Sequence, residues 1–287
     1  MVYAIVFVVL CGLTFLTGVP LNGYVLFVAG CRVERTVSAV WFWNRALADF
    51  IFIIFLPIRF IFISIPNFVL VKRMISTVTS LHMFSSAFLL TAFSVDRCIL
   101  VARPEWAWNC HMLPLAFRVV IGLWALSLGF SLRYGDVSDY LLSPPSISTY
   151  SNLDEGRVKA TIAMQFLVGF LVPFTLILIP TFYIVLADKL RRNRPIQSTK
   201  PLKILLGLIP TFFLCWLLYH VFSLLPISNM DPLSHLHLGR AFACVLTYFS
   251  SCLNPIFYLT MDKEFLKYQQ HARNPQTTDN LGPELDE

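Results

Sequence analysis

The sequence is short of charge. Only 13% of its 287 residues are Asp, Glu, Lys or Arg, whereas 57% are hydrophobic and the mean hydropathy is +0.70. A soluble globular domain has about 25% charged residues, so this composition excludes an ordinary soluble protein. It favours a chain that crosses a membrane several times, and nothing in it indicates a nucleic-acid partner.

Several functional signals are also missing. The chain has no Asn-x-Ser/Thr sequon, so N-glycosylation gives no guide to its orientation. No basic leader with a small-residue cleavage site precedes the apolar run from Val2, so we expect no cleaved signal peptide. His235 and His237 have metal-like spacing, but a loop pair without further ligands is a weak metal signal. With no nucleophile–base constellation either, we expect neither an enzyme nor a cofactor.

What the chain does contain is long apolar segments, each near the roughly 20 residues that a spanning helix needs. Seven are predicted: Val2–Gly30, Val37–Ile63, Val69–Val101, Leu115–Leu132, Thr161–Leu186, Pro201–Leu225 and Leu238–Met261. The connections are short except 133–159, whose polar residues predict a surface loop. We therefore predict an all-α membrane protein, a seven-transmembrane helix bundle over 1–261. A short amphipathic helix along the membrane follows over 262–273, and then a disordered cytoplasmic tail over 274–287.

The basic residues predict the orientation, because cytoplasmic loops carry an excess of Lys and Arg. With the N-terminus outside, 14 of the 22 Lys and Arg fall on the inner side and 7 on the outer side, and Arg45 remains inside the membrane. A run of them, Lys189–Lys203, connects the fifth and sixth segments. It suits anionic lipid and an acidic partner surface, although it also acts as a simple topology signal. We expect a multi-pass plasma-membrane protein with its N-terminus outside and its C-terminus in the cytoplasm.

An adjacent acid and base, Asp96 and Arg97, stand at the end of the third segment. A charge at the bilayer centre costs about 2.5–3.5 kcal/mol on insertion scales, so charges in membrane segments are few and usually functional. At the end of a helix the pair is cheap, because it reaches headgroups and water. Two interpretations remain: a switch whose members change partners, and a plain anchor at the membrane surface.

Each of the seven segments carries a short motif. In chain order the motifs are Leu21-Asn22-Gly23-Tyr24-Val25, Ala46-Leu47-Ala48-Asp49, Asp96-Arg97-Cys98, Trp124, Pro173, Cys215-Trp216 and Asn254-Pro255-Ile256-Phe257-Tyr258. With these motifs the chain resembles the rhodopsin-like G-protein-coupled receptors. Stretches such as Gly30-Cys31-Arg32 and Arg103-Pro104 are similar to the chemoattractant receptors, meaning the formyl peptide receptors and the chemoattractant receptor for prostaglandin D. The resemblance implies an extracellular lipid or peptide ligand and a heterotrimeric G protein of the inhibitory class. It also implies arrestin and membrane lipids as further partners.

The resemblance assigns the activation switch to Asp96, Arg97, Trp216, Asn254, Pro255 and Tyr258. It implies that Asp96 holds Arg97 until the sixth helix moves outward, and that Trp216 lies at the base of an outer ligand pocket. The alternative for Trp216 is plain core packing. Proline removes a backbone donor, so we expect Asn254-Pro255 to interrupt the seventh helix and let Tyr258 swing inward.

The chain departs from the family pattern at several positions. Lys72 stands where the family has a cysteine, and 133–159 contains none either, so no extracellular disulfide is expected. Leu218 replaces the usual proline of the sixth helix, and Pro210 displaces any kink toward the cytoplasm. Thr181 stands where the fifth helix usually offers a tyrosine.

A further departure lies in the second helix, where Arg45 replaces the usual leucine. In the family, the residues matching Asp49, Ser86, Ser250 and Asn254 hold a sodium ion. Arg45 is four residues before Asp49 and so lies on the same helix face. We predict that this built-in cation makes sodium binding weak or absent. The alternative is that Arg45 faces a neighbouring helix or snorkels, and leaves the site intact.

The ligand is poorly specified. The acid and the two arginines of the formyl peptide receptors are replaced by Ser80, Thr161 and Gln165, and Gln165 also replaces the lysine of the prostaglandin relative. The outer ligand-binding candidates are Arg59, His82, Gln165, Tyr219, His220 and Arg240. A positive, aromatic cavity favours an anionic lipid or a peptide carboxylate.

Three hypotheses cover these observations. The first is a signalling receptor with its ligand outside and a G protein inside. The second is a diverged, orphan or engineered receptor fold that does not signal, a decoy; the departures above and the short outer N-terminal segment favour it. The third is a small-solute transporter or light-driven pump, but we find no paired broken segments and no lysine in Leu238–Met261 for a retinal Schiff base.

Overall fold

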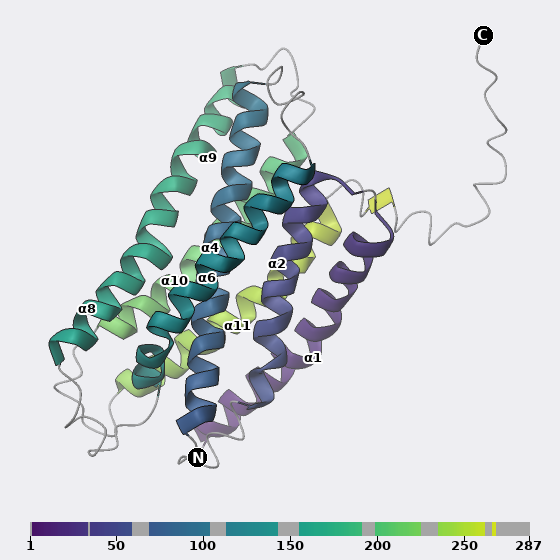
Figure 1. Cartoon of the computed structure of the whole chain (residues 1–287). Helices are drawn as coiled ribbons and strands as arrows, with labels where there is room; N and C mark the ends of the chain where they lie inside the picture. Colours follow the sequence, from purple (N-terminus) through teal and green to yellow (C-terminus); the bar gives the residue numbers. More distant parts are fainter. Residues whose placement is uncertain are drawn as a thin grey trace, which may run out of the picture.

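A computed structural model describes residues 2–33, 35–58, 69–103, 113–142, 155–190, 199–224, 235–261 and 266–267. Within these residues the chain is a bundle of helices (Figure 1). The elements are α1 (Val2–Cys31), α2 (Val37–Ile54), α4 (Val69–Ala102), α6 (Leu113–Leu142), α8 (Glu155–Phe166), the π-helical η1 (Leu167–Leu171), α9 (Val172–Leu190), α10 (Thr199–Leu224) and α11 (His235–Met261).

The predicted number of membrane spans is confirmed. Seven helical stretches of the described chain are long and apolar enough to cross a bilayer, and α8, η1 and α9 together supply one of them, Ala160–Ala187. The helix α4 is the centre of the bundle, because it packs against α2, α6, α9, η1 and α10. The pairs α1–α2, α1–α11 and α10–α11 close the other side.

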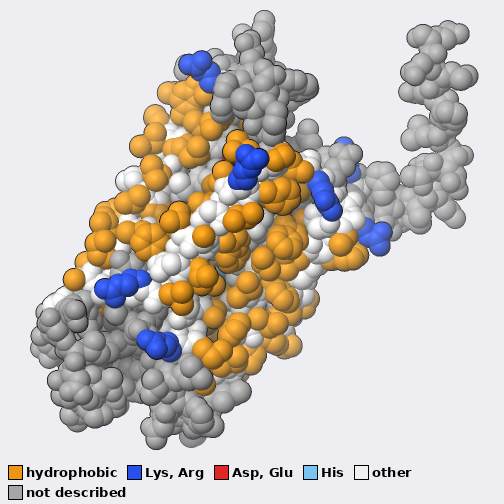
Figure 2. All heavy atoms as spheres, in the orientation of Figure 1, with side chains coloured by type: hydrophobic (Ala, Val, Ile, Leu, Met, Phe, Trp, Pro, Cys, Tyr) orange, Lys and Arg blue, Asp and Glu red, His pale blue; other side chains and the backbone are white. Residues whose placement is uncertain are grey.

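The surface matches a lipid environment. Large apolar side chains such as Leu16, Ile121, Ile179 and Phe182 are 68–70% exposed, although water would penalise such exposure. Figure 2 shows a broad hydrophobic belt on one face, with Lys and Arg toward its two ends. The belt spans the bundle as expected for helices that face lipid.

Some expected boundaries were wrong. The helix α6 continues to Leu142, ten residues past the predicted end at Leu132, so 133–142 is helical rather than loop. His235 and His237, expected in a loop, lie in the first turn of α11. Polar residues extend helices beyond the apolar core at little cost once the backbone hydrogen bonds continue. Of the predicted amphipathic helix, only Leu266 and Lys267 are described, and both are helical; the tail over 274–287 lies outside the described residues.

The expected interruption at Pro255 was also wrong. The helix α11 runs unbroken from His235 to Met261 with Pro255 inside it. Pro20, Pro180 and Pro210 likewise lie inside α1, α9 and α10. A proline in a membrane helix removes one backbone donor, and neighbouring helices and local adjustment compensate for that loss.

The segment η1 was not predicted. The N–H of Val172 bonds to the carbonyl of Leu167, which is the wider turn of a π-helix. Gly169 lies in this turn, and a Cβ there would be 2.6 Å from Cε of Met83 on α4. Glycine therefore permits the close contact between η1 and α4.

Candidate functional site

The site is built around Asp49, a fully buried carboxylate in the middle of α2. Its Oδ2 accepts a hydrogen bond of 2.8 Å from Nδ2 of Asn254 on α11. Its Oδ1 lies 2.8 Å from Nε2 of His82 on α4. Because both carboxylate oxygens have hydrogen-bond partners on other helices, Asp49 ties α2, α4 and α11 together. We call Asp49, Arg45, His82, Ser251 and Asn254 the central polar cluster.

His82 belongs to this cluster and is only 2% exposed. Its residue type predicted a place in an outer cavity, and its contact with Asp49 was not predicted. The signal was available, because His82 precedes Ser86 by four residues and so shares its helix face. The ring stacks on Phe52 at 4.1 Å, and Phe52 stacks in turn on Tyr248 at 4.1 Å.

The contacts of His82 do not form a catalytic relay. Ser251 Oγ lies 3.1 Å from Nε2, the same nitrogen that faces Asp49. A serine–histidine–aspartate relay uses the two different ring nitrogens. An ionised carboxylate only accepts hydrogen bonds, so Nε2 donates to Asp49 and has no proton-accepting lone pair for Ser251. The cluster is a structural polar network rather than a nucleophile.

Arg45 is buried, at 5% exposure, and lies beside the carboxylate. Its Nε is 3.8 Å from Asp49 Oδ2, within ion-pair range, and its Nη1 donates to the Ser86 carbonyl at 2.5 Å. The guanidinium carbon also lies 5.5 Å from the Phe212 ring centre. Arg45 therefore neutralises Asp49 from one turn away and connects α2 to α4.

The charge already present beside Asp49 disfavours a sodium ion. Both Asp49 oxygens are engaged by hydrogen-bond donors, and a permanent cation lies 3.8 Å from one of them. Ser250, one of the expected ligands, instead donates to Thr247 of its own helix at 2.7 Å. Hard cations bind through several free oxygen atoms. Ser86 Oγ and Asn254 Oδ1 are buried and have no hydrogen-bond partner among the described residues, but the Arg45 guanidinium already supplies a positive charge beside the carboxylate.

We expect sodium to leave this protein unaffected. A ligand that binds only the folded state raises the unfolding temperature, so exchanging potassium for sodium at constant ionic strength should not move the melting temperature of the purified protein. The Arg45→Leu variant, which removes the internal cation, should gain a sodium-dependent rise. A sodium-dependent shift of the unmodified protein equal to that of the variant would contradict this assignment.

The second part of the site is the pair Asp96–Arg97 near the end of α4. Arg97 donates to Asp96 Oδ2 from Nε at 3.0 Å and from Nη2 at 2.6 Å. The Arg97 side chain is 8% exposed and that of Asp96 12%. The guanidinium carbon lies 5.3 Å from the Phe93 ring centre. In this conformation the base is held by the neighbouring acid, as the switch interpretation requires.

Trp216 lies beside His82 of the central polar cluster, and Tyr258 lies near Arg45 and Phe93. Trp216 is fully buried on α10, with its ring 5.8 Å from His82 and 5.2 Å from Tyr219. Tyr258 is fully buried on α11 and stacks on Phe42 at 4.7 Å. Each therefore contacts rings on a second helix, which a shift of α10 or α11 would disturb.

The outer candidates divide into two groups. Gln165, Tyr219 and His220 are at most 3% exposed; Gln165 contacts Met83, and His220 packs against Phe166 and Phe170. These three therefore contact protein rather than face open solvent. Arg240 lies on α11, whereas Arg59 lies outside the described residues.

Comparisons with known proteins match this arrangement. The model of a family described as 7 transmembrane receptor (rhodopsin family) matches residues 21–258. Chemerin-like receptor 1 of Homo sapiens is 36% identical over 276 residues, which cover 88% of this chain and 74% of the relative. N-formyl peptide receptor 3 of Homo sapiens is 30% identical over 281 residues, which cover 88% and 78%. The similarity therefore includes the motifs that form the site.

Proposed function

The chain belongs to the rhodopsin family of seven-transmembrane receptors and is a cell-surface G-protein-coupled receptor for an extracellular ligand; from this we propose that it detects an anionic ligand, a lipid or a peptide carboxylate, and activates a G protein of the inhibitory class. The N-terminus lies outside and the C-terminus inside. Arrestin is a further cytoplasmic partner. The Asp96–Arg97 pair is the observation that supports G-protein activation, because Arg97 donates two hydrogen bonds to Asp96 near the end of the central helix and could be released from it.

The proposed ligand class rests on the positive charge of two arginines and on the names of the similar receptors. Arg59 and Arg240 supply positive charge at the outer side, and carboxylates are the natural partners of guanidinium groups. The names of the relatives refer to chemerin and to N-formyl peptides, and the second of these favours a peptide. Gln165 supplies an amide rather than a charge, so recognition depends on the two arginines.

The proposed steps on the cytoplasmic side involve Arg97 and Asn254. Arg97 is released when α10 moves away from α4, and it then meets the G protein. Asn254 transmits changes at Asp49 to α11, because its amide donates to that carboxylate at 2.8 Å. The excess of Lys and Arg on the inner side, with the run Lys189–Lys203, supports this orientation.

A ligand panel tests the proposal. Cells expressing the receptor are exposed to anionic lipids and to peptides with a free C-terminal carboxylate, and activation of each G-protein class is recorded. We expect an active compound to weaken at least about tenfold when its carboxylate is amidated or esterified, as losing a charge-assisted hydrogen bond implies. Arg59→Gln and Arg240→Gln should lower the potency of the ligand with a free carboxylate and leave the potency of its neutral form unchanged.

The matched control is Lys72→Gln, which removes an outer positive charge that is not assigned to the ligand. It should leave potency unchanged. Equal potency of acid and neutral ligands would reject the anionic class, and activation confined to another G-protein class would reject inhibitory coupling.

A further inference from the structure

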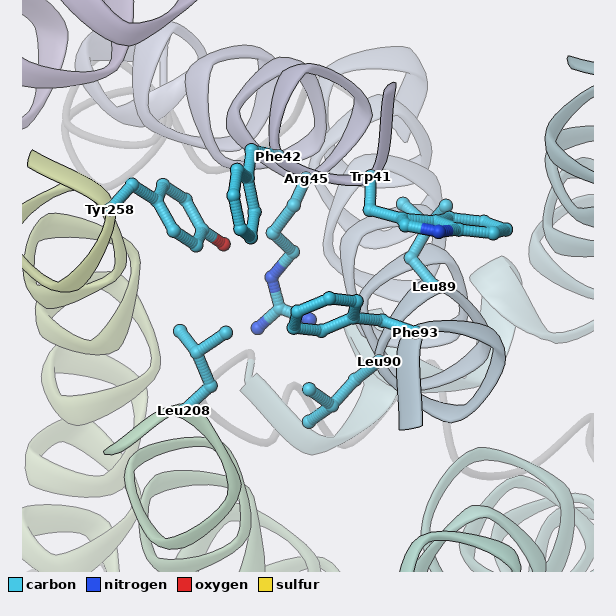
Figure 3. A pocket seen from close by; sticks show the side chains of 8 residues that line it. All are labelled: Trp41, Phe42, Arg45, Leu89, Leu90, Phe93, Leu208 and Tyr258. Carbon is cyan, nitrogen blue, oxygen red and sulfur yellow. The ribbon is translucent and has the colours of Figure 1, made fainter. Parts of the chain in front are cut away.

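A small cavity lies beside Arg45 of the central polar cluster, where α2, α4, α10 and α11 meet (Figure 3). Leu89, Leu90 and Phe93 line it from α4, and Leu208 lines it from α10. The volume open to the centre of a water-sized sphere is about 10 Å³. About one water molecule fits such a space.

Two polar groups, the Arg45 guanidinium and the Tyr258 hydroxyl, meet in this largely apolar cavity, whose lining also includes Trp41 with an indole N–H that has no hydrogen-bond partner among the described residues. The Tyr258 hydroxyl points toward the Arg45 side chain, whose guanidinium lies at the centre of the lining residues (Figure 3). Tyr258 Oη is buried and has no hydrogen-bond partner among the described residues. Arg45 uses Nη1 for the Ser86 carbonyl, and a guanidinium has five N–H donors in all. Donors and a hydroxyl therefore face the same small space.

The charge balance decides what this space binds. The guanidinium already has the Asp49 carboxylate within 3.8 Å, so a small anion would add an uncompensated charge to a low-dielectric interior. A cation would face the guanidinium directly. A neutral molecule that both donates and accepts suits the lining, and buried waters commonly join polar groups that lack protein partners.

We propose that one water molecule binds in this cavity and bridges the Arg45 guanidinium to the Tyr258 hydroxyl. The bridge extends the polar network from Asp49 through Arg45 to Tyr258, across the apolar layer formed by Leu89, Leu90 and Leu208. Arg45 is thereby a positioning residue for Tyr258, which packs on Phe42. Phe93, which lines the same cavity, contacts Arg97 through its ring, so the site lies beside the Asp96–Arg97 pair.

A double-mutant cycle on thermal and chemical unfolding of the purified full-length receptor tests the bridge without relying on signalling. Tyr258→Phe removes only the hydroxyl, and Arg45→Met keeps an apolar stem without the donors. If water joins the two groups, Tyr258→Phe should shift the unfolding equilibrium about fivefold in the unmodified background, the factor for one average hydrogen bond. In the Arg45→Met background it should have no further effect.

The hydroxyl control is Tyr183→Phe, on an exposed position of α9, which should show no coupling to Arg45→Met. Equal effects of Tyr258→Phe in both backgrounds would overturn the bridge. If Arg45→Met does not fold, an experimental density map of the unmodified receptor decides. Water density within hydrogen-bond distance of both groups supports the proposal, whereas a direct Arg45–Tyr258 contact or a dry cavity overturns it.

The consequence for activation rests on the proposed function. Loss of the bridge should raise ligand-free activation in Arg45→Met, because Tyr258 is then less firmly held. If Tyr258→Phe and Arg45→Met are coupled in unfolding but Arg45→Met does not change ligand-free activation, the water site stands and its role in activation is rejected. If the two substitutions are not coupled in unfolding while the unmodified receptor activates a G protein normally, the water site is rejected and the proposed receptor function stands.

Discussion

Replacing Asp49 by leucine should strongly destabilise the receptor. The carboxylate accepts hydrogen bonds from His82 and Asn254 and balances Arg45, all in a fully buried site. Removing one partner of a buried charge pair leaves the other charge uncompensated and costs about 3–5 kcal/mol. We therefore expect Asp49→Leu to reach the cell surface poorly, as measured by surface labelling, and to melt well below the unmodified receptor after purification.

The second substitution makes this prediction specific. Adding Arg45→Met to Asp49→Leu removes the stranded charge, so part of the lost stability should return even though His82 has lost its carboxylate partner. Ser250→Ala is the control, since Ser250 is equally buried but, within the part of the chain that the structure describes, its hydroxyl bonds only to Thr247 of α11. Asp49→Leu behaving like Ser250→Ala, or a further loss in the double variant, would show that Arg45 and Asp49 do not compensate each other.

Replacing Asp96 by asparagine should raise ligand-free activation. Both hydrogen bonds from Arg97 end on one carboxylate oxygen, and the pair is largely shielded from water. A hydrogen bond to a charged group contributes about 1.5–3 kcal/mol, so its loss should shift the balance of held to released Arg97 by roughly tenfold or more. The measurement is G-protein activation without ligand, at matched surface density.

Ser94→Ala is the matched control for Asp96→Asn. Ser94 is fully buried on the same turns of α4, and among the described residues its hydroxyl bonds only to the Leu90 carbonyl of that helix. Its replacement should leave ligand-free activation unchanged. A rise in both variants would indicate general loosening of α4, and no rise in Asp96→Asn would mean that the acid does not hold Arg97.

The number and order of spans were predictable because the bilayer imposes one strong constraint. Each span needs about 20 apolar residues whose backbone bonds are satisfied internally, and this requirement is visible in the sequence. The extension of α6 to Leu142 and the π-turn at Leu167–Leu171 were not predictable in the same way. In the first, polar residues continue a helix, and in the second, η1 lies close against α4 at Gly169; hydropathy gives no guide to either.

The candidate site shows the same division. The i, i+4 spacing of Arg45 and Asp49 predicts that these two members of the central polar cluster meet, and the ion pair has the expected partners. The contact of His82 with Asp49 joins α2 to α4 across 33 residues. The four-residue spacing of His82 and Ser86 indicated the helix face that carries this contact, whereas residue type alone favoured the outer cavity.

We propose that the chain transmits its signal through Arg97. The most direct measurement compares G-protein activation by the unmodified receptor and by Arg97→Ala, with and without the ligand panel, at equal surface density. We expect the unmodified receptor to activate at least one G protein and Arg97→Ala to lose this activation while it still reaches the surface. Activation that persists in Arg97→Ala would contradict the role of Arg97. No activation of any G protein by a normally expressed receptor would favour the decoy hypothesis instead.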